Sequence, residues 1–426
     1  MALRVQQLNA DTTFLLTFTP PFEPDNHLAR FPGDFTVLVD PWLSGPSSVL
    51  HPAFQTSHHV AEPAIASLQE VGGLVDLIII SQDKPDHCHR ETLCSLPRNS
   101  RIDILATSAA VKKIKSWSHF ENDCVHTMRP YDPDARNTLL GIPLAGYGSS
   151  NSGQGRVTIA HIPAKRDPTG LHNAIGITYQ PPSSTFALNT QDGRHEPGVT
   201  VQLTNKGVSR PTTPARSRAN SRSAPSTPLD WTSASWRDKP GKTPNHSPTR
   251  VDSGISTSTS RSTKNREQTI SVIYTPHGLS PQFLKPYLNK HLAPLQAFPV
   301  LALFHSMTVE SNPWIMGGTV SRGAPGGLQL AKALGGVQYW LSAHDEEKEN
   351  LGLATKWCKS RLYNVRDVNA MLSDASMSET TAMRLVVGER IRLPISGEGK
   401  ARMNGGKMRS MPDLRKPQGG NGEYGG

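Results

Sequence analysis

The sequence lacks any apolar run long enough to cross a lipid bilayer. Its longest apolar stretches, at residues 77–80 and 298–304, fall far short of the roughly 20 residues that a transmembrane helix needs. The opening residues, MALRVQQLNADTTF, contain no apolar segment of the kind found in secretory signals. We therefore expect a protein that neither spans a membrane nor enters the secretory pathway.

Cysteine is also scarce. The chain has four cysteines among 426 residues and no Cys-x-x-Cys pair. Small secreted proteins that depend on disulfides use many regularly spaced cysteines, so this class is excluded. The pattern favours a reducing compartment. We expect the cytoplasm, with the nucleus as the alternative.

The apolar fraction is low for a chain of this length. Hydrophobic residues make up 36% and charged residues 19%, while glycine and proline each number 35. Between residues 211 and 260, 31 of 50 residues are Ser, Thr, Pro or Arg. Such a segment buries too little apolar surface to offset a chain entropy of about 1–2 kcal/mol per residue. We predict that residues 204–268 are a disordered insert and residues 396–426 a disordered, glycine-rich tail.

The net charge of +10 is concentrated in these two segments. Residues 205–266 hold 12 Lys or Arg and 3 Asp, a net of +9, and residues 397–426 hold 6 basic and 3 acidic residues, a net of +3. The remainder is therefore close to −2. The insert has only Trp231 and Trp236 to stack on bases and no known nucleic-acid motif. Nucleic acid is thus not an expected partner.

Strand and helix patterns alternate on both sides of the insert. Short β-branched or apolar runs predict strands at residues 13–18, 35–40, 75–81, 102–107, 156–162, 174–179, 270–274, 298–304, 337–342 and 384–393. Helices are predicted at 62–71, 108–115, 281–290, 326–334 and 346–359. Because a long surface insert adds little closure entropy, we predict one α/β domain in two parts, 1–203 and 269–395.

Side chains that bind metals follow four of these strands. They are Asp40 after the strand at 35–40, Asp86, His87 and His89 after 75–81, His277 after 270–274, and His344 after 337–342. Ligand sites in α/β folds gather at the carboxyl ends of strands. Carboxylate oxygen and imidazole nitrogen together suit zinc or another divalent metal. The alternatives are strand-end turns for Asp40 and hydrogen-bonded loop histidines for the others.

Taken together, these motifs resemble the metallo-β-lactamase fold superfamily. The resemblance rests on Asp40, on the Ser-x-x-x-x-Asp-His loop that begins at Ser81, on the Pro-Ala loop at Pro163, on IYTPHG around His277, and on the strand that leads to His344. It covers residues 9–363 apart from the insert. The sequence is most similar to the lactonase/phosphodiesterase-like branch and its plant, cyanobacterial and fungal relatives. The resemblance implies an αββα sandwich, two mixed sheets between helices, with a metal site along one edge.

The sequence departs from the superfamily at several ligand positions. Gln82 and Lys84 replace the two leading histidines of the His-x-His-x-Asp-His motif, and Arg166 stands where a third histidine is expected. The bridging aspartate of the fourth motif has no clear counterpart, and His277 falls nearest to it. The resemblance therefore leaves Asp86, His87 and His344 at the second metal position. His277 and His89 would complete a site for one ion.

This ligand set leaves two functions open. In the first, a zinc or other divalent ion lowers the pKa of bound water from 15.7 toward about 7, and the protein hydrolyses an ester, lactone or phosphodiester bond of a small molecule. Asp86 would be a ligand or base, Asp40 would orient the loop, and Lys84 and Arg166 would bind an anionic substrate or stabilise an oxyanion. In the second, the fold is a non-catalytic scaffold regulated by phosphorylation of its basic insert.

The insert carries four Ser/Thr-Pro steps that a proline-directed kinase could modify. They are Thr213-Pro214, Thr227-Pro228, Thr243-Pro244 and Ser247-Pro248, and arginines flank them. Phosphate there would reduce the positive charge and create a binding site for a phospho-recognising partner. An unmodified flexible linker is the alternative.

Deletion of residues 205–266 tests this view of the insert. We expect the free energy of unfolding to change by less than about 1 kcal/mol, since loop length has a weak effect on closure entropy. Binding of a partner that recognises the phosphorylated insert should disappear. Denaturant titration measures the first and capture by the kinase-treated chain the second; unchanged capture would contradict the proposed role.

Overall fold

The computed structural model describes residues 1–21, 33–135, 137–144, 155–182, 269–314 and 317–395, together with the backbone of 402–403. The predicted insert at 204–268, with its four Ser/Thr-Pro steps, lies outside the described residues. So does the predicted tail at 396–426, apart from the short strand β21 (Arg402–Met403).

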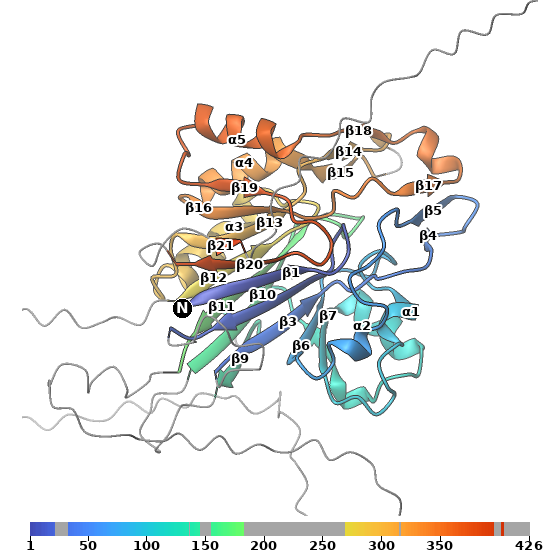
Figure 1. Ribbon diagram of the computed structural model, residues 1–426, viewed down its shortest axis with the longest axis horizontal. Coiled ribbons are helices and arrows are strands. Elements are labelled where there is room, and N and C mark those ends of the chain that lie inside the picture. The colour runs from blue at the N-terminus through green and yellow to red at the C-terminus, as the bar shows by residue number, and fades with distance from the viewer. Residues whose placement is uncertain are drawn as a thin grey trace, which may run out of the picture.

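Two large sheets form the centre of the fold (Figure 1). The first has the order β21-β20-β1-β2-β3-β6-β7-β8. Its other strands are β20 (Arg390–Pro394), β1 (Ala2–Gln7), β2 (Phe14–Thr19), β3 (Phe35–Val39), β6 (Leu77–Ile80), β7 (Asp103–Thr107) and β8 (Val125–Met128). Strands β1, β2 and β3 pair antiparallel, whereas β3, β6, β7 and β8 run parallel.

The second sheet has the order β19-β16-β13-β12-β11-β10-β9. Its strands are β19 (Thr381–Met383), β16 (Val337–Ser342), β13 (Val300–His305), β12 (Ile270–Tyr274), β11 (Asn173–Gln180), β10 (Gly155–Pro163) and β9 (Leu139–Leu144). Strands β12, β13, β16 and β19 are parallel. Strand β11 precedes residues 183–268 and pairs with β12, which follows them. The two parts of the chain thus share one sheet.

Alternating side chains divide the core into layers. On β6, Leu77 and Ile79 face the core between the sheets, whereas Ile78 and Ile80 face a second apolar cluster beneath the helices. Successive side chains of a strand point to opposite faces, so a strand that is apolar on both faces is covered on both. The apolar run after Val75 therefore already indicates a central strand.

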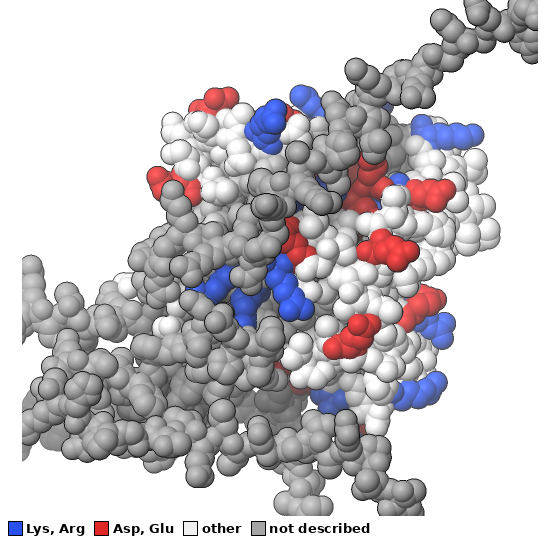
Figure 2. Space-filling model, in the orientation of Figure 1, with Lys and Arg blue, Asp and Glu red and all other residues white. Residues whose placement is uncertain are grey.

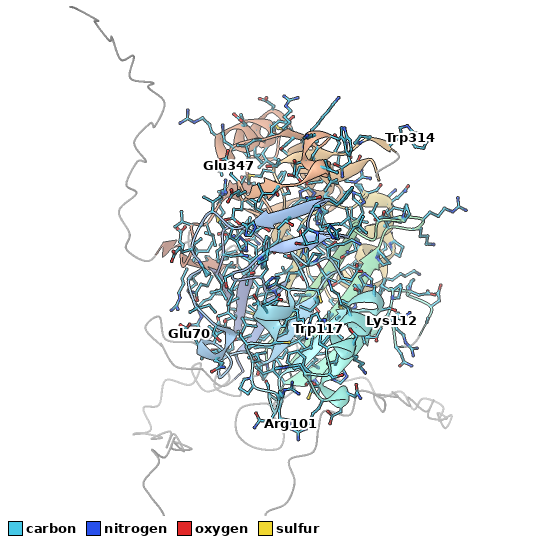
Figure 3. The ribbon with its side chains drawn as sticks, turned by 90° about the vertical axis from the view of Figure 1, so that its right-hand side faces the viewer. Glu70, Arg101, Lys112, Trp117, Trp314 and Glu347 are labelled. Carbon is cyan, nitrogen blue, oxygen red and sulfur yellow. The ribbon has the colours of Figure 1, made fainter. Side chains whose placement is uncertain are left out.

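Helices cover the outer face of each sheet. The first sheet carries α1 (Arg90–Leu93) and α2 (Ser108–Ser116), and Lys112 of α2 points to solvent (Figure 3). The second carries α3 (Pro281–Tyr287), α4 (Gly323–Ala333) and α5 (Val365–Asp374). Shorter helical turns are Leu68–Glu70, Asn122–Cys124, Leu288–Leu292 and Leu353–Lys356. The predicted αββα sandwich is therefore confirmed.

Two small sheets lie beside the sandwich. One has the order β15 (Thr319–Arg322), β14 (Val309–Ser311) and β18 (Lys359–Arg361), and the other β17 (Glu349–Leu351), β5 (Gln55–His58) and β4 (Ser47–Val49). Exposed apolar side chains also occur in this part of the molecule, including Trp314, which projects from the surface with 87% of its area exposed (Figure 3).

Two helix predictions were wrong. Instead of the predicted helix at 62–71, the structure has a single helical turn, Leu68–Glu70. A capping box of Ser67 and Glu70 caps its N-terminal end. The predicted helix at 346–359 is replaced by β17, a helical turn and β18. Gly352 has a φ of 109°, a conformation that breaks a helix, and β17 pairs with β5 far away in sequence. Contacts with distant strands overrode the local helical preference.

Charged side chains are mixed over most of the visible face. Several Lys and Arg side chains lie together near β20 and β1, and other basic and acidic side chains are scattered over the rest of the visible face (Figure 2). All four cysteines lie among the described residues, and none forms a disulfide. Within the ranges that the structure describes, no helix combines the length and the apolar character needed to cross a membrane.

Gly176 of β11 offers a test of the packing between the second sheet and its helices. A Cβ at this position would lie 2.5 Å from the ring of Tyr287, which is fully buried. We expect Gly176→Ala to lower the free energy of unfolding by about 1–3 kcal/mol, the usual cost of overpacking. Gly73→Ala is the control, because no atom lies within 4 Å of its Cβ position. Equal effects in denaturant titrations would refute this packing.

Candidate metal centre

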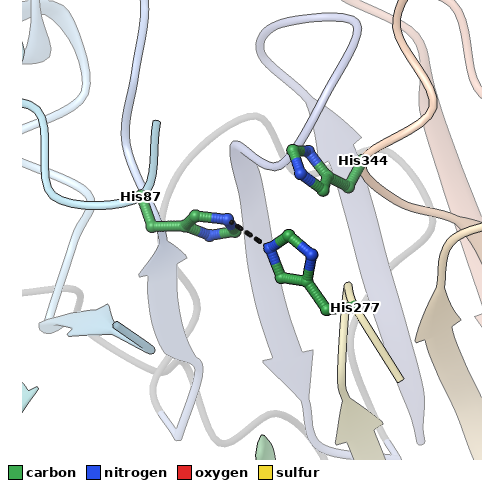
Figure 4. Close-up of side chains that lie close together, drawn as sticks. All are labelled: His87, His277 and His344. Atoms are coloured by element: carbon green, nitrogen blue, oxygen red, sulfur yellow. Dashed lines mark hydrogen bonds between the residues drawn. The ribbon is translucent and has the colours of Figure 1, made fainter. Parts of the chain in front are cut away.

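Three histidines meet where the carboxyl ends of the parallel strands face one another. His87 follows β6, His277 follows β12 and His344 follows β16, so both sheets contribute. Their ligand nitrogens lie within 4.8 Å of one another, and His87 and His277 are buried (Figure 4). The sequence thus placed these three residues correctly at strand ends, and the sheets bring them together.

Asp86 lies beside this group. The Nε2 atoms of His87 and His277 are 3.1 Å apart, and Asp86 Oδ2 lies 3.6 Å from His87 Nε2 and 3.7 Å from His344 Nε2. Around a tetrahedral ion with bonds of about 2.0–2.1 Å, ligand atoms are separated by roughly 3.3 Å. The three histidines therefore form a cluster that could hold a metal ion, and Asp86 lies near two of them.

Each histidine is held through its other ring nitrogen. Nδ1 of His87 lies 2.8 Å from Asp40 Oδ2, Nδ1 of His277 lies 3.1 Å from the carbonyl oxygen of Val320, and Nδ1 of His344 lies 3.0 Å from both carboxylate oxygens of Asp11. The Lys348 ammonium also lies 3.0 Å from Nδ1 of His344. The partners of His87 and His277 are acceptors, so Nδ1 of these two rings carries the proton and donates. The lone pair of each of their Nε2 atoms is then directed into the cluster. Metal-binding histidines have this arrangement.

The contact between His87 and His277 shows what the cluster requires. When both Nδ1 atoms donate, the two Nε2 atoms are both acceptors, and two lone pairs face each other across 3.1 Å. Burial and the neighbouring His344 and His87 hold the pKa of His277 well below its usual value, so this ring is neutral at physiological pH. A cation held between the two atoms removes this repulsion, and so does a second proton on His87 that its Nε2 donates to His277.

Two carboxylates, the buried Asp11 and the partly buried Asp86, remain ionised. Burial raises the pKa of Asp11, but His344 and Lys348 outweigh it and hold the pKa well below the ordinary value. Burial likewise raises the pKa of Asp86, and the opposing charges of His87 and His344 lower it overall. For His344 the balance runs the other way: burial lowers its pKa, and Asp11 raises it above the usual value. Asp11 and Asp86 therefore place two negative charges beside the cluster, and Lys348 and His344 offset part of them.

Asp40 holds the loop that carries His87. Its carboxylate accepts hydrogen bonds from the main-chain N–H of Ser81 at 2.7 Å, from the Ser81 hydroxyl at 2.5 Å and from the Tyr274 hydroxyl at 2.8 Å, besides the bond from His87. Asp40 has a φ of 43°, in the left-handed region that aspartate tolerates better than most residues. The geometry is that of an orienting residue.

Asp11 and Lys348 were not identified as site residues from the sequence. The Lys348 ammonium lies 2.7 Å from Asp11 Oδ2 and 5.5 Å from the ring centre of Trp42. Asp11 thus binds both Lys348 and His344. The only sequence signal was the position of Lys348 four residues after His344. Asp11 lies in a polar turn between β1 and β2, far away in the chain, so no spacing connects it to the site.

His89 lies outside the histidine cluster and has a different local role. It is the residue before α1, and its Nδ1 accepts a hydrogen bond from the Thr92 main-chain N–H at 3.3 Å. Its Nε2 lies 3.4 Å from the carbonyl oxygen of Pro46. Both nitrogens therefore have partners within the loop, as expected for a helix-capping side chain.

The three residues that replace the expected histidines differ in their surroundings. Lys84 is partly exposed and lies 3.5 Å from Asp83. Arg166 is exposed, with a φ of 61°. Gln82 is buried, and neither of its amide atoms has a hydrogen-bond partner among the described residues. A buried amide without a hydrogen-bond partner costs about 1–3 kcal/mol of stability. The Gln82 side chain is therefore a buried polar group whose hydrogen bonds the surrounding described residues do not satisfy.

A mutant cycle tests the coupling of Lys348 and Asp11. We expect Lys348→Met to lower the free energy of unfolding by about 1.5–3 kcal/mol, the range for a hydrogen bond to a charged group. In an Asp11→Asn background the same change should cost less, with a coupling of at least about 0.5 kcal/mol. Denaturant titrations with a chelator present measure all four proteins. Additive effects would show that the two side chains do not stabilise each other.

No family model matches the sequence, and no curated protein matches it. Three solved structures are similar in overall arrangement. An isothiocyanate hydrolase from Delia radicum gut bacteria is 10% identical, with a TM-score of 0.43 over 91% of this chain and 97% of the other. A protein described as a possible metal-dependent hydrolase, from Veillonella parvula, is 10% identical, with a TM-score of 0.42 over 92% and 99%. Unliganded yeast PDE1 is 6% identical, with a TM-score of 0.43 over 92% and 99%.

These likenesses are distant, and the fold is established by the strand order itself. Two mixed sheets pack face to face, helices cover both outer faces, and the histidines lie at the carboxyl edge that the two sheets share. The chain has an αββα fold, the arrangement that the resemblance to the metallo-β-lactamase fold superfamily predicts.

Proposed function

We propose that this chain is a metal-dependent hydrolase that binds one divalent ion through Asp86, His87, His277 and His344. The observation that carries the proposal is the orientation of the three imidazoles. Nδ1 of His87 and of His277 is bound to an acceptor, Nδ1 of His344 is held by Asp11 and Lys348, and the three rings offer ligand atoms within 4.8 Å of one another. Histidines that only filled space would not need a separate partner to orient each ring.

The donor set fits zinc best among the common divalent ions. Three imidazole nitrogens and one carboxylate oxygen match the ligands and the tetrahedral geometry that zinc adopts in proteins. Magnesium and calcium prefer oxygen ligands, of which only Asp86 is available here. Asp86 is also the one ligand with an appreciable exposed fraction, 19% of its side chain, so the site opens to solvent on its side.

A bound divalent ion would supply a Lewis acid that polarises the scissile bond and activates water. Asp40 keeps the proton of His87 on Nδ1 and thereby fixes the direction of Nε2. Asp11 does the same for His344, and Lys348 offsets part of its negative charge. The exposed edge of Asp86 can accept a proton from water. An ester, lactone or phosphodiester of a small molecule is the proposed substrate.

Lys84 and Arg166 remain proposed substrate-binding residues. Both follow strand ends on the side of the molecule where the carboxyl edges meet, and both carry a positive charge that no buried carboxylate neutralises among the described residues. Guanidinium and ammonium groups bind the anionic oxygens of phosphodiesters and of carboxylates formed by hydrolysis. If the protein does not bind a metal, the alternative function, a non-catalytic scaffold, is favoured instead.

Metal content measured by elemental analysis tests the proposal. We expect about one equivalent of zinc or another divalent metal after reconstitution, and less than a tenth of an equivalent in His87→Ala. Asp40→Asn should weaken the metal affinity by about 10–100-fold, because it removes the acceptor that fixes the His87 tautomer. Competition with a chromophoric chelator measures this affinity.

His126→Ala is the matched control. His126 is also paired with an aspartate, Asp103, at 2.7 Å, but it lies on β8 outside the cluster. Its replacement should leave the metal content unchanged. A wild-type protein that takes up less than a tenth of an equivalent after reconstitution would refute the metal centre.

A further inference from the structure

A pocket lies beside the end of β16 and is lined by Ser342 and Asp345, the residues on either side of the Ala343–His344 pair. It has a volume of about 520 Å³, within the range of small-molecule sites, and its floor is formed by the buried residues Met307, Ser342 and Asp345. Residues 362–366 and Arg384 form its walls. The pocket therefore lies beside β16 and the start of α5, in the upper part of Figure 1.

Two arginines give this pocket a positive charge. Arg384 donates a hydrogen bond from Nη2 to the carbonyl oxygen of Asp345 at 2.8 Å, which anchors it and leaves its other donors available. Arg366 is exposed at the rim. Within the part of the chain that the structure describes, neither guanidinium forms an ion pair with a carboxylate. Both can therefore bind an anion without first breaking an existing pair.

The one carboxylate in the floor is already satisfied. Asp345 accepts hydrogen bonds from the hydroxyls of Ser306 and Ser342, at 2.7 and 2.6 Å, and from the main-chain N–H groups of Met307 and Thr308, at 2.8 and 2.9 Å. Four donors thus compensate its charge inside the protein. Asp345 does not neutralise Arg366, and the pocket remains net positive.

The remaining lining is apolar or aromatic. Met307, Leu362, Val365 and Tyr363 also line the pocket. Arg361 lies over the Tyr363 ring, 4.7 Å from its centre, and holds the ring in place from outside. Asn364 and Asp367 form a capping box at the start of α5, so the first helical turn already has its own hydrogen-bond partners. The arginine side chains are the groups left to bind an anion.

We propose that this pocket binds an organic anion, a phosphate or carboxylate attached to an apolar or aromatic body. Guanidinium groups bind two oxygens of such an anion at once, and the apolar wall accepts the rest of the molecule. The inference does not depend on the metal centre. Because Asp345 and His344 are adjacent in the chain, an occupant would also restrain the loop that positions His344.

Titration calorimetry with phenyl phosphate and with benzoate tests the pocket directly. We expect one site with a dissociation constant below about 1 mM, no heat from benzyl alcohol, and at least about tenfold weaker binding in Arg366→Glu. Arg384→Gln should weaken binding similarly. Because Arg366 is exposed, Arg366→Glu should leave the thermal unfolding midpoint unchanged. This variant therefore still tests the pocket if Arg384→Gln fails to fold.

Arg98→Glu is the matched control, because Arg98 is an exposed arginine on the side of the first sheet. It should bind both anions as the wild type does. Binding must also persist in His87→Ala and with a chelator present. Unchanged binding by Arg366→Glu, or no binding by the wild type, would overturn the proposal. Loss of binding on metal removal would place the anion at the metal centre and overturn the separate pocket.

Discussion

The structure of the candidate centre depends on one buried carboxylate. Asp40 leaves β3 in a left-handed conformation and receives donors from the loop after β6 and from Tyr274 at the end of β12. It therefore connects the carboxyl edges of both sheets. A buried carboxylate without partners would cost several kcal/mol, so these donors have to be in place whenever the protein is folded. The direction of His87 follows from that requirement, since its Nδ1 is one of the donors.

Asp11 is a second buried carboxylate that needs hydrogen-bond donors. This need distinguishes the candidate metal centre from the apolar core. Asp11 is buried and holds Lys348 and His344, as Asp40 holds Tyr274 and His87. Apolar side chains between the sheets pack without such partners. At the edge, burial disfavours the charged forms. It lowers the pKa of His277, whereas at Asp11 and Asp86 the neighbouring positive charges outweigh it and lower the pKa overall. A protein that needed only a stable sandwich would be more stable with apolar residues there.

Prediction from the sequence succeeded where the signal was local. The strand after Val75 is apolar on both faces and was predicted from that pattern. The strands Ile270–Tyr274 and Val337–Ser342 match the predicted bounds. The positions of His277 and His344 after the ends of these two strands followed directly. Prediction failed where distant contacts decide. The residues after Glu346 were predicted as a helix, yet Glu349–Leu351 pairs with Gln55–His58. Lys348 was therefore assigned to the wrong element and its contact with Asp11 could not be foreseen.

The sequence alone indicated an α/β domain with metal-binding residue types at its strand ends, because periodicity and turn residues act over a few positions. The arrangement in two sheets followed only from the resemblance to the metallo-β-lactamase fold superfamily. The sequence also located the excess positive charge in the segments at 205–266 and 397–426. Only the tertiary structure decided which of the histidines converge, how Asp11 and Asp40 fix them, and that His89 serves as a helix cap instead. The physical reason is that a binding site joins side chains from strands far apart in the chain. Their distances and tautomers are set by hydrogen bonds that no local pattern encodes.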